Sequence, residues 1–453
     1  MTKPLALAMI VLLFSGIATT CVRAIPTRDK QAIIEDLNAY GLDVMDLYPS
    51  GEPTTANDYY KLGIAYLFRN IPRVAAEQFR KSLELDAEHV DSLIGLAASV
   101  VQLEGAAAAV EYAEKALKIA PDDARVSNAL GALKLASAIS LEDLNQAEAS
   151  FLKAISIDPS LVAPHMNLAR LYMSMRKPEA AIKEYEAAIA LQPENLSAHA
   201  GLASAYLILG SLDMATGEVE KIVELSPDSV IAHNTLGELY ARTGQHDKAL
   251  ERFQKAVEIE PTYAAGYRNM GRLYVLMGIQ DKAIEEFKKA LSYRPNYGEA
   301  HSGLGDAYIT KGMTQEAIES YKEAIKILPM SALVSIPAYN NLAYIYAEQE
   351  QDLDKALSLV QKAQQLAPEH PDIADTIGWI YYKKELYDEA LPNLQVAAKG
   401  SPDNPIIRYH LGAAYYHLGA KDEALAELET AFKMSDKFEG SEDARRLLTE
   451  LRQ

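Results

Sequence analysis

Four histidines recur in register along the chain, at a spacing that could arrange metal ligands. They are separated by 34 residues or by twice that interval: His165, His199, His233 and His301. If each occupies the same position in a series of stacked helical units, neighbouring rings are roughly 8–10 Å apart. A shared zinc ion needs each ligand nitrogen at about 2.0–2.1 Å. We therefore expect no metal site at these histidines, and the sequence predicts no cofactor.

The sequence contains none of the short motifs that position catalytic groups. There is no H-E-x-x-H pair, no glycine-rich phosphate loop, no G-x-S-x-G nucleophile elbow and no paired-glycine nucleotide fingerprint. Adjacent acids such as Glu285 and Glu286 fall on the outward face of a predicted helix, where they are expected to be solvated. The chain is therefore predicted to be non-enzymatic.

The overall charge excludes another class of function. The formal net charge is −19 and the isoelectric point is near 5.0, so a basic surface that could bind duplex nucleic acid is not expected. Hydrophobic residues make up 49% of the chain and charged residues 24%, which is typical of a folded protein.

The elements that would position functional residues are clearest in residues 230–297, where two consecutive 34-residue segments share one template. The shared positions are Leu236-Gly237 and Met270-Gly271, Tyr240 and Tyr274, Ala249 and Ala283, Phe253 and Phe287, and Pro261 and Pro295. Leu236 and Tyr240 fall on one face of an amphipathic helix. Gly237 lets a second helix cross the first closely, and Pro261 ends that second helix.

This spacing, L-G-x-x-Y…A-x-x-x-F…P at a period of 34, resembles the tetratricopeptide repeat (TPR) family. The resemblance implies an all-α fold: an α-solenoid, wound as a right-handed superhelix of about eleven helix-turn-helix repeats with a C-terminal capping helix. The aligned repeats are 56–89, 90–123, 124–161, 162–195, 196–229, 230–263, 264–297, 298–331, 336–370, 371–404 and 405–438. Extra residues near 139–144, at 332–335 and within 348–353 are expected to lie in loops. In this register the four histidines fill the slot where the family consensus has tryptophan.

The two ends of the chain differ from the repeats. Residues 1–24 combine Lys3, an apolar run over 5–17 and a small-x-small pattern ending at Ala24, which predicts a signal peptide. The alternatives are an uncleaved membrane anchor and a lipid-modified Cys21. The protein is accordingly expected to be exported, as a bacterial-type periplasmic or otherwise extracytoplasmic protein. Residues 25–55 are predicted to form a capping helix and linker, and residues 439–453 a C-terminal capping helix.

The family resemblance places one face of each first helix on the inside of the superhelix, where partners bind. Two candidate partner-binding groups lie there: an arginine–asparagine patch of Asn234, Arg242, Arg268, Asn269 and Arg272, and an aromatic patch of Tyr344, Trp379, Tyr382, Tyr409 and Tyr416. The first could hold a peptide backbone or an acidic tail. Its arginines could instead balance Glu238 and nearby acids. The second could offer exposed anchors to a partner, or could pack between repeats and against the capping helix.

The resemblance implies a scaffold that binds a protein or peptide segment in its concave groove, in envelope, secretion or surface assembly. The alternative is an accessory protein of polysaccharide biosynthesis or export that binds carbohydrate or a glycosyltransferase partner, because side chains such as Trp379 and Tyr382 also suit sugar rings. The lysine and asparagine positions of the family's chaperone-tail carboxylate clamp are occupied by other residues here. The oligomeric state is left open.

Overall fold

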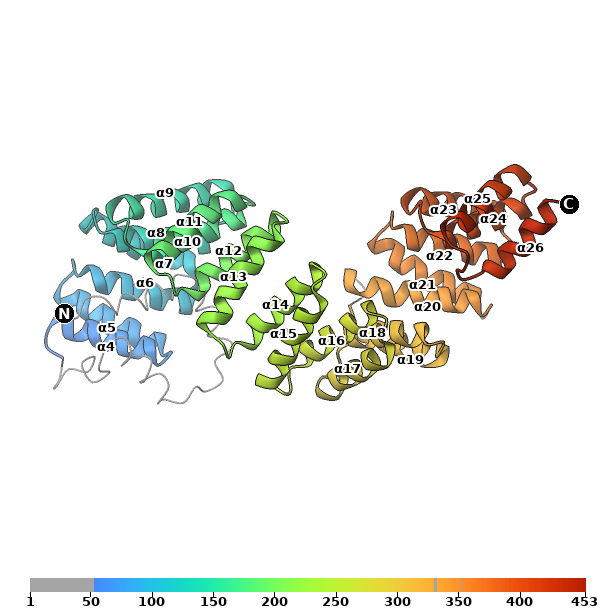
Figure 1. Ribbon diagram of the computed structural model, residues 1–453. Helices are drawn as coiled ribbons and strands as arrows, with labels where there is room; N and C mark the ends of the chain where they lie inside the picture. The colour runs from blue at the N-terminus through green and yellow to red at the C-terminus, as the bar shows by residue number, and fades with distance from the viewer. Residues whose placement is uncertain (1–52, 330–331, 351) are drawn as a thin grey trace. The chain divides into compact units, whose positions relative to one another are not determined.

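The computed structural model describes residues 53–329, 332–350 and 352–453 (Figure 1). Across these residues every regular element is helical, with 23 α-helices, one short 3-10 helix and no strand. Consecutive helices pack as pairs, and each pair stacks on the next within its unit. The predicted all-α solenoid is therefore confirmed.

The chain divides into two compact units. Unit 1 ends at Pro227, and unit 2 begins at Asp228. Unit 1 contains α4 (Ala56–Phe68), α5 (Pro72–Leu85), α6 (Val90–Glu104), α7 (Ala106–Ile119), α8 (Ala124–Ala136), α9 (Leu141–Ile157), α10 (Val162–Ser174), α11 (Pro178–Leu191), α12 (Leu196–Ile208) and α13 (Leu212–Leu225). Unit 2 contains α14 (Val230–Arg242), α15 (His246–Ile259), α16 (Ala264–Leu276), α17 (Gln280–Tyr293), α18 (Gly298–Thr310), α19 (Thr314–Ile327), η2 (Leu333–Ser335), α20 (Ile336–Glu348), α21 (Leu353–Leu366), α22 (Pro371–Lys383), α23 (Tyr387–Gly400), α24 (Pro405–His417), α25 (Lys421–Met434) and α26 (Ser441–Leu451).

Tight turns join the two helices of a pair, as between α14, which has 13 residues, and α15, which has 14. Gly244 in this turn has a φ of +74°, a left-handed conformation that glycine adopts without steric cost. The N–H of Gly244 donates to the carbonyl of Ala241 at 3.2 Å, and that of Gln245 donates to Tyr240 at 2.8 Å. These bonds satisfy the last carbonyls of α14 and fix where α15 begins.

In several pairs an aromatic or leucine side chain of the second helix packs against a glycine of the first helix, as Phe253 does against Gly237 and Leu394 against Gly378. A Cβ atom added at Gly237 would lie 2.6 Å from the ring of Phe253, so only glycine leaves room for that ring. Ala249 and Ala256 of α15 are fully buried beside it. The close helix crossing predicted from the glycine and alanine spacing is confirmed here.

The expectation that the extra residues near 139–144 form a loop is wrong in part. Helix α9 has 17 residues, whereas the other second helices have 14, so the insertion mainly lengthens α9. Ser140 begins this helix with a capping box, in which Ser140 accepts from the N–H of Asp143 and the Asp143 carboxylate accepts from the N–H of Ser140. Residues 333–335 form η2, directly before α20.

The predicted signal peptide, Cys21 and most of the predicted N-terminal capping helix and linker lie outside the described residues. Within the described ones, Thr55 caps α4 and forms a capping box with Asp58. No helix among residues 53–329, 332–350 and 352–453 is both long and apolar enough to cross a membrane. At the other end, α26 packs against α24 and α25 and covers the last helix pair.

Candidate partner-binding site

The arginine–asparagine patch lies on α14 and α16, and its two asparagines are bonded to each other. Nδ2 of Asn269 donates to Oδ1 of Asn234 at 2.8 Å and to Oε1 of Glu238 at 2.7 Å. Both asparagines are buried. They join one repeat to the next, and a buried amide that is already paired has little capacity left for a ligand.

The three arginines of this patch differ in their surroundings. Arg268 forms an ion pair with Glu299, lies 3.9 Å from Glu238, and its side chain is only 13% exposed. Arg268 therefore balances the charge of nearby acids, which is the second of the two interpretations given for these arginines. Arg242 and Arg272 are exposed, and neither forms an ion pair with any residue the structure describes.

Polar pairs like Asn234 and Asn269 recur between first helices in both units. In unit 1, Asn167 donates to Asn128 at 3.0 Å. In unit 2, Asn341 donates to Asp306 at 3.1 Å. Nδ1 of His410 lies 2.9 Å from Oδ1 of Asp375, and all four of these pairs link consecutive repeats. We define them as inter-repeat latches.

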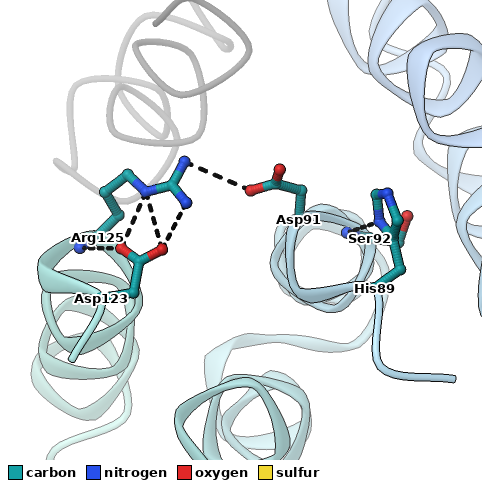
Figure 2. Close-up of polar contacts among 5 residues, drawn as sticks. All are labelled: His89, Asp91, Ser92, Asp123 and Arg125. Carbon is teal, nitrogen blue, oxygen red and sulfur yellow. Dashed lines mark hydrogen bonds and ion pairs between the residues drawn. The ribbon is translucent and has the colours of Figure 1, made fainter. Parts of the chain in front are cut away.

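A charged contact of the same kind joins α6 and α8 (Figure 2). Arg125 on α8 lies 3.5 Å from Asp91 on α6 and also binds Asp123, the residue that caps α8. Its charge-assisted hydrogen bonds with Asp123 raise the pKa of Arg125. Figure 2 also shows His89 accepting from the N–H of Ser92 at the start of α6. These groups position the helix ends of unit 1.

Three of the histidines in register have hydrogen-bond partners in the same repeat or at the end of the preceding one. Nδ1 of His165 lies 2.7 Å from Glu184, and Nδ1 of His199 lies 2.6 Å from Glu218. Nε2 of His301 lies 3.0 Å from the carbonyl of Pro295. The described part of the chain contains no group of histidines, cysteines and acids arranged to hold a metal ion. His165 and His199 therefore link the two helices of one repeat, and His301 bonds to the closing proline of the preceding repeat.

The aromatic patch borders a pocket of about 470 Å³ in unit 2, which we name the C-terminal pocket. Helices α20, α22 and α24 form its wall, and the segment before α26 with the start of α26 closes it. Its lining residues are Tyr344, Glu348, Glu350, Trp379, Tyr382, Lys383, Glu385, Tyr387, Tyr409, His410, Glu439, Gly440, Asp443 and Arg446. Four of the five predicted aromatic residues are therefore brought together around one cavity.

Trp379 does not offer a free face to this pocket. Its ring is stacked on Tyr382, with centroids 4.5 Å apart, and on His410, with centroids 3.8 Å apart. The indole N–H donates to Glu348 at 2.5 Å. The side chain is only 3% exposed, so the prediction that Trp379 is an exposed anchor is wrong. Its function in the wall of the pocket is to hold neighbouring repeats together.

Tyr409 and Tyr416 contact the C-terminal capping helix, as the alternative interpretation of the aromatic patch proposed. The hydroxyl of Tyr409 donates to Asp443 at 2.9 Å, and that of Tyr416 donates to Glu450 at 2.5 Å. Tyr409 is buried, and Gly440 packs so closely on its ring that an added Cβ atom would lie 2.3 Å away. Tyr344 and Tyr382 are half-buried and remain on the surface of the pocket.

Acidic side chains dominate the polar lining of the C-terminal pocket. Five carboxylates face two cations: Glu348, Glu350, Glu385, Glu439 and Asp443 against Lys383 and Arg446. Burial, together with the neighbouring charge of Glu348, raises the pKa of Glu439. Burial likewise raises the pKa of Tyr344 and Tyr382 far above the ordinary value for tyrosine, so their hydroxyls remain protonated donors.

The acids of the pocket were not identified from the sequence. Glu348 is the last residue of α20, Glu350 and Glu385 lie in turns, and Glu439 lies just before α26. No spacing in the sequence relates these positions, because they meet only through the stacking of three repeats and the capping helix. Only the predicted C-terminal capping helix gives a hint of this site from the sequence, because a capping helix brings residues near 439–443 against the last repeats.

Comparisons with known proteins place the repeats in a family. Four tetratricopeptide repeat models match the chain. One matches residues 60–124 and 166–230, a second matches 134–161 and 336–370, a third matches 228–296, and a fourth matches 281–336 and 381–451. The search of curated proteins gives no match.

Solved structures with similar folds include three repeat proteins. MamA is 28% identical, with a TM-score of 0.33 over 35% of this chain and 93% of MamA. YrrB, described as a TPR protein with an unusual peptide-binding site, is 24% identical, with a TM-score of 0.34 over 42% of this chain and 96% of YrrB. A tetratricopeptide repeat protein from Parabacteroides merdae is 20% identical, with a TM-score of 0.44 over 53% of this chain and 93% of that protein. On the repeat models, which together span most of residues 60–451, the chain belongs to the tetratricopeptide repeat family.

Proposed function

We propose that this protein is a non-enzymatic scaffold that binds a segment of a partner protein, with the C-terminal pocket as its principal site. Stacked helical repeats present extended surfaces that proteins of this architecture use for binding. The observation that carries the proposal is the pocket itself. Its volume, about 470 Å³, is in the range of functional ligand sites.

The lining suits a peptide better than a sugar. A sugar ring stacks on a free aromatic face, but both faces of Trp379 are covered by Tyr382 and His410. Tyr382 is itself stacked on Trp379 and is met edge-on by Tyr387 and His417. The half-buried Tyr344 and the rim carboxylates instead provide an apolar wall with charged groups beside it, which matches a peptide side chain. The carbohydrate alternative is therefore the weaker proposal.

The cellular setting is a separate part of the proposal. We propose export to an extracytoplasmic compartment and a role in envelope or surface assembly, on the pattern of residues 1–24. Sequencing the N-terminus of the protein purified from its native cells tests this. A mature chain that begins at Ile25 is expected, and an intact Met1 in a cytoplasmic fraction would contradict it.

The binding proposal is tested by selection and photo-crosslinking. The full chain is used to select binders from a displayed library of random peptides, and the recovered peptides are synthesised. A photo-reactive amino acid is placed at Glu385, on the pocket rim, and in a control variant at Glu319, an exposed residue of α19. We expect the peptides to crosslink at position 385 and not at 319. The proposal fails if no peptide is recovered, if both positions label equally, or if a glycan array alone gives binding.

A further inference from the structure

We propose that the C-terminal pocket recognises a lysine or arginine side chain, and hence that the partner segment is basic at the residue it inserts. This inference rests on the proposed function, because it specifies what the peptide must carry. The family's carboxylate clamp binds acidic tails, so the proposal gives this chain the opposite charge preference.

The first step is the charge balance of the pocket. Its lining holds five carboxylates and two cations, which leaves a formal charge of −3 with His410 neutral. Lys383 lies 3.4 Å from Glu350 and 3.9 Å from Glu348, and Arg446 is paired with Asp443. Glu385 and Glu439 form no ion pair with any other residue in the described ranges. A cationic ligand would therefore find two carboxylates that are not already paired with a lysine or an arginine of the protein.

The second step is the proximity of two carboxylates, Glu348 and Glu439, which both line the pocket. Glu348 comes from the end of α20 and Glu439 from the segment before α26, and each repels the other's charge. Glu348 already accepts from the indole N–H of Trp379, which orients its carboxylate. Two like charges held beside one cavity are stabilised by a cation between them. Burial and the neighbouring charge of Glu348 raise the pKa of Glu439, and a cation bound beside these carboxylates would offset both effects.

The third step is the apolar wall. A lysine or arginine has a long aliphatic stem below its charged group, and such stems pack on apolar surface while the charge stays near water or a counter-ion. Tyr344 provides a half-buried ring for the stem, and an aromatic ring also attracts a cation. A small metal ion would use the carboxylates but not the rings. The combination of aromatic wall and acidic rim is therefore specific to an organic cation.

The test uses the selected peptides and two matched pairs of protein variants. In each peptide, lysine is replaced by norleucine or arginine by citrulline, which removes the charge and keeps the shape. Glu439→Gln is compared with Glu319→Gln on α19. Glu350→Lys, whose side chain is 67% exposed and paired with Lys383, is compared with Glu224→Lys in unit 1, which is 66% exposed and paired with Lys221. Dissociation constants are measured by titration calorimetry, and circular dichroism verifies the fold of each variant.

We expect every crosslinking peptide to contain lysine or arginine, and loss of that charge to weaken binding about tenfold. Glu439→Gln and Glu350→Lys should weaken binding to a similar extent, whereas both control variants should bind normally. Peptides that crosslink at position 385 but tolerate norleucine or citrulline would overturn this inference and leave the scaffold proposal standing. Failure to recover any peptide would overturn both. Tight binding of Ca²⁺ that displaces the peptide would overturn the inference in favour of a metal site.

Discussion

Nε1 of Trp379 donates a hydrogen bond to Oε1 of Glu348, 2.5 Å away in the preceding repeat. Because His410 of the following repeat stacks on the same indole ring, Trp379 joins three consecutive repeats. One wall of the C-terminal pocket is therefore also a structural joint of unit 2. Mutations in this wall must be separated into those that unfold the unit and those that alter binding.

Replacing Trp379 with Ala is expected to destabilise unit 2 rather than only weaken binding. Truncation of a buried aromatic side chain costs about 3–5 kcal/mol, because contacts are lost and a cavity remains. Urea unfolding followed by circular dichroism should show a lower midpoint. As a control, Leu276→Ala removes a side chain that is 70% exposed and should leave the midpoint almost unchanged. An unchanged midpoint for Trp379→Ala would show that the indole is not a joint.

The latch between Asn234 and Asn269 should contribute to stability as a unit. Asn269→Ala leaves Oδ1 of Asn234 without its buried donor, although Nδ2 of Asn234 still donates to Glu238, and an unsatisfied buried polar group costs about 1–3 kcal/mol. The double variant with Asn234→Ala should cost less than the sum of the two single changes, since the partner is no longer left unpaired. The free energies of unfolding of the two single variants and the double variant are compared by urea unfolding. If the losses in the single variants simply add up in the double variant, the two asparagines do not act as a latch.

Gly237→Ala is expected to destabilise its helix pair by overpacking. The new Cβ atom would lie 2.6 Å from the ring of Phe253, and forcing an extra carbon into a packed core costs about 1–3 kcal/mol. Adding Phe253→Val should recover part of the loss, because the repeat at 196–229 has the buried residues Ala203 and Val219 at the two equivalent positions. Thermal unfolding of both variants tests the packing. A double variant less stable than either single variant would contradict it.

Arg176→Gly is expected to stabilise unit 1. Arg176 has a φ of +56° in the turn before α11, where several other repeats have glycine. A non-glycine residue in this conformation carries a penalty of about 1 kcal/mol, part of which is offset by the greater flexibility of glycine in the unfolded chain. The urea midpoint should rise slightly. A clear fall would mean that the Arg176 side chain makes contacts that outweigh the strain of its backbone.

The raised pKa of Glu439 predicts a pH-dependent difference between the wild type and Glu439→Gln. The native state favours the protonated carboxyl, so the wild type loses stability as the pH rises from the unfolded-state pKa through the higher folded-state pKa. Tyr344, Glu348 and His410 face this carboxyl. The variant should therefore unfold at a higher urea concentration than the wild type near neutral pH, and the difference should vanish below about pH 4. Equal midpoints at neutral pH would contradict the shift.

Much of the architecture follows from the sequence because the repeat template records local packing. Gly237, Ala249 and Phe253 meet within one helix pair, so their spacing alone predicts their contact. The spacing of Ser140 and Asp143 also matches a capping box, which indicates that a helix begins there, whereas the extra length of the repeat alone suggests a loop.

The candidate site was predicted less completely, because its residues meet between repeats. The burial of Trp379 depends on Glu348 and His410, each 31 residues away in the chain, and both faces of the indole are covered only once the repeats stack. Glu439 reaches Glu348 from the segment before the capping helix. A repeat template assigns a position to a face of a helix but does not say which neighbour covers that face. The template therefore places four of the aromatic residues around one pocket, but it does not reveal that Trp379 is buried.

Hydrogen–deuterium exchange with and without a selected peptide tests the central claim most directly, because it reports where the peptide lies on the intact chain. Binding in the C-terminal pocket should slow exchange at the ends of α20 and α22 and in the segment between α25 and α26. Exchange in α15, α17 and α19 should be unchanged. Protection confined to unit 1 or to those second helices would contradict the account.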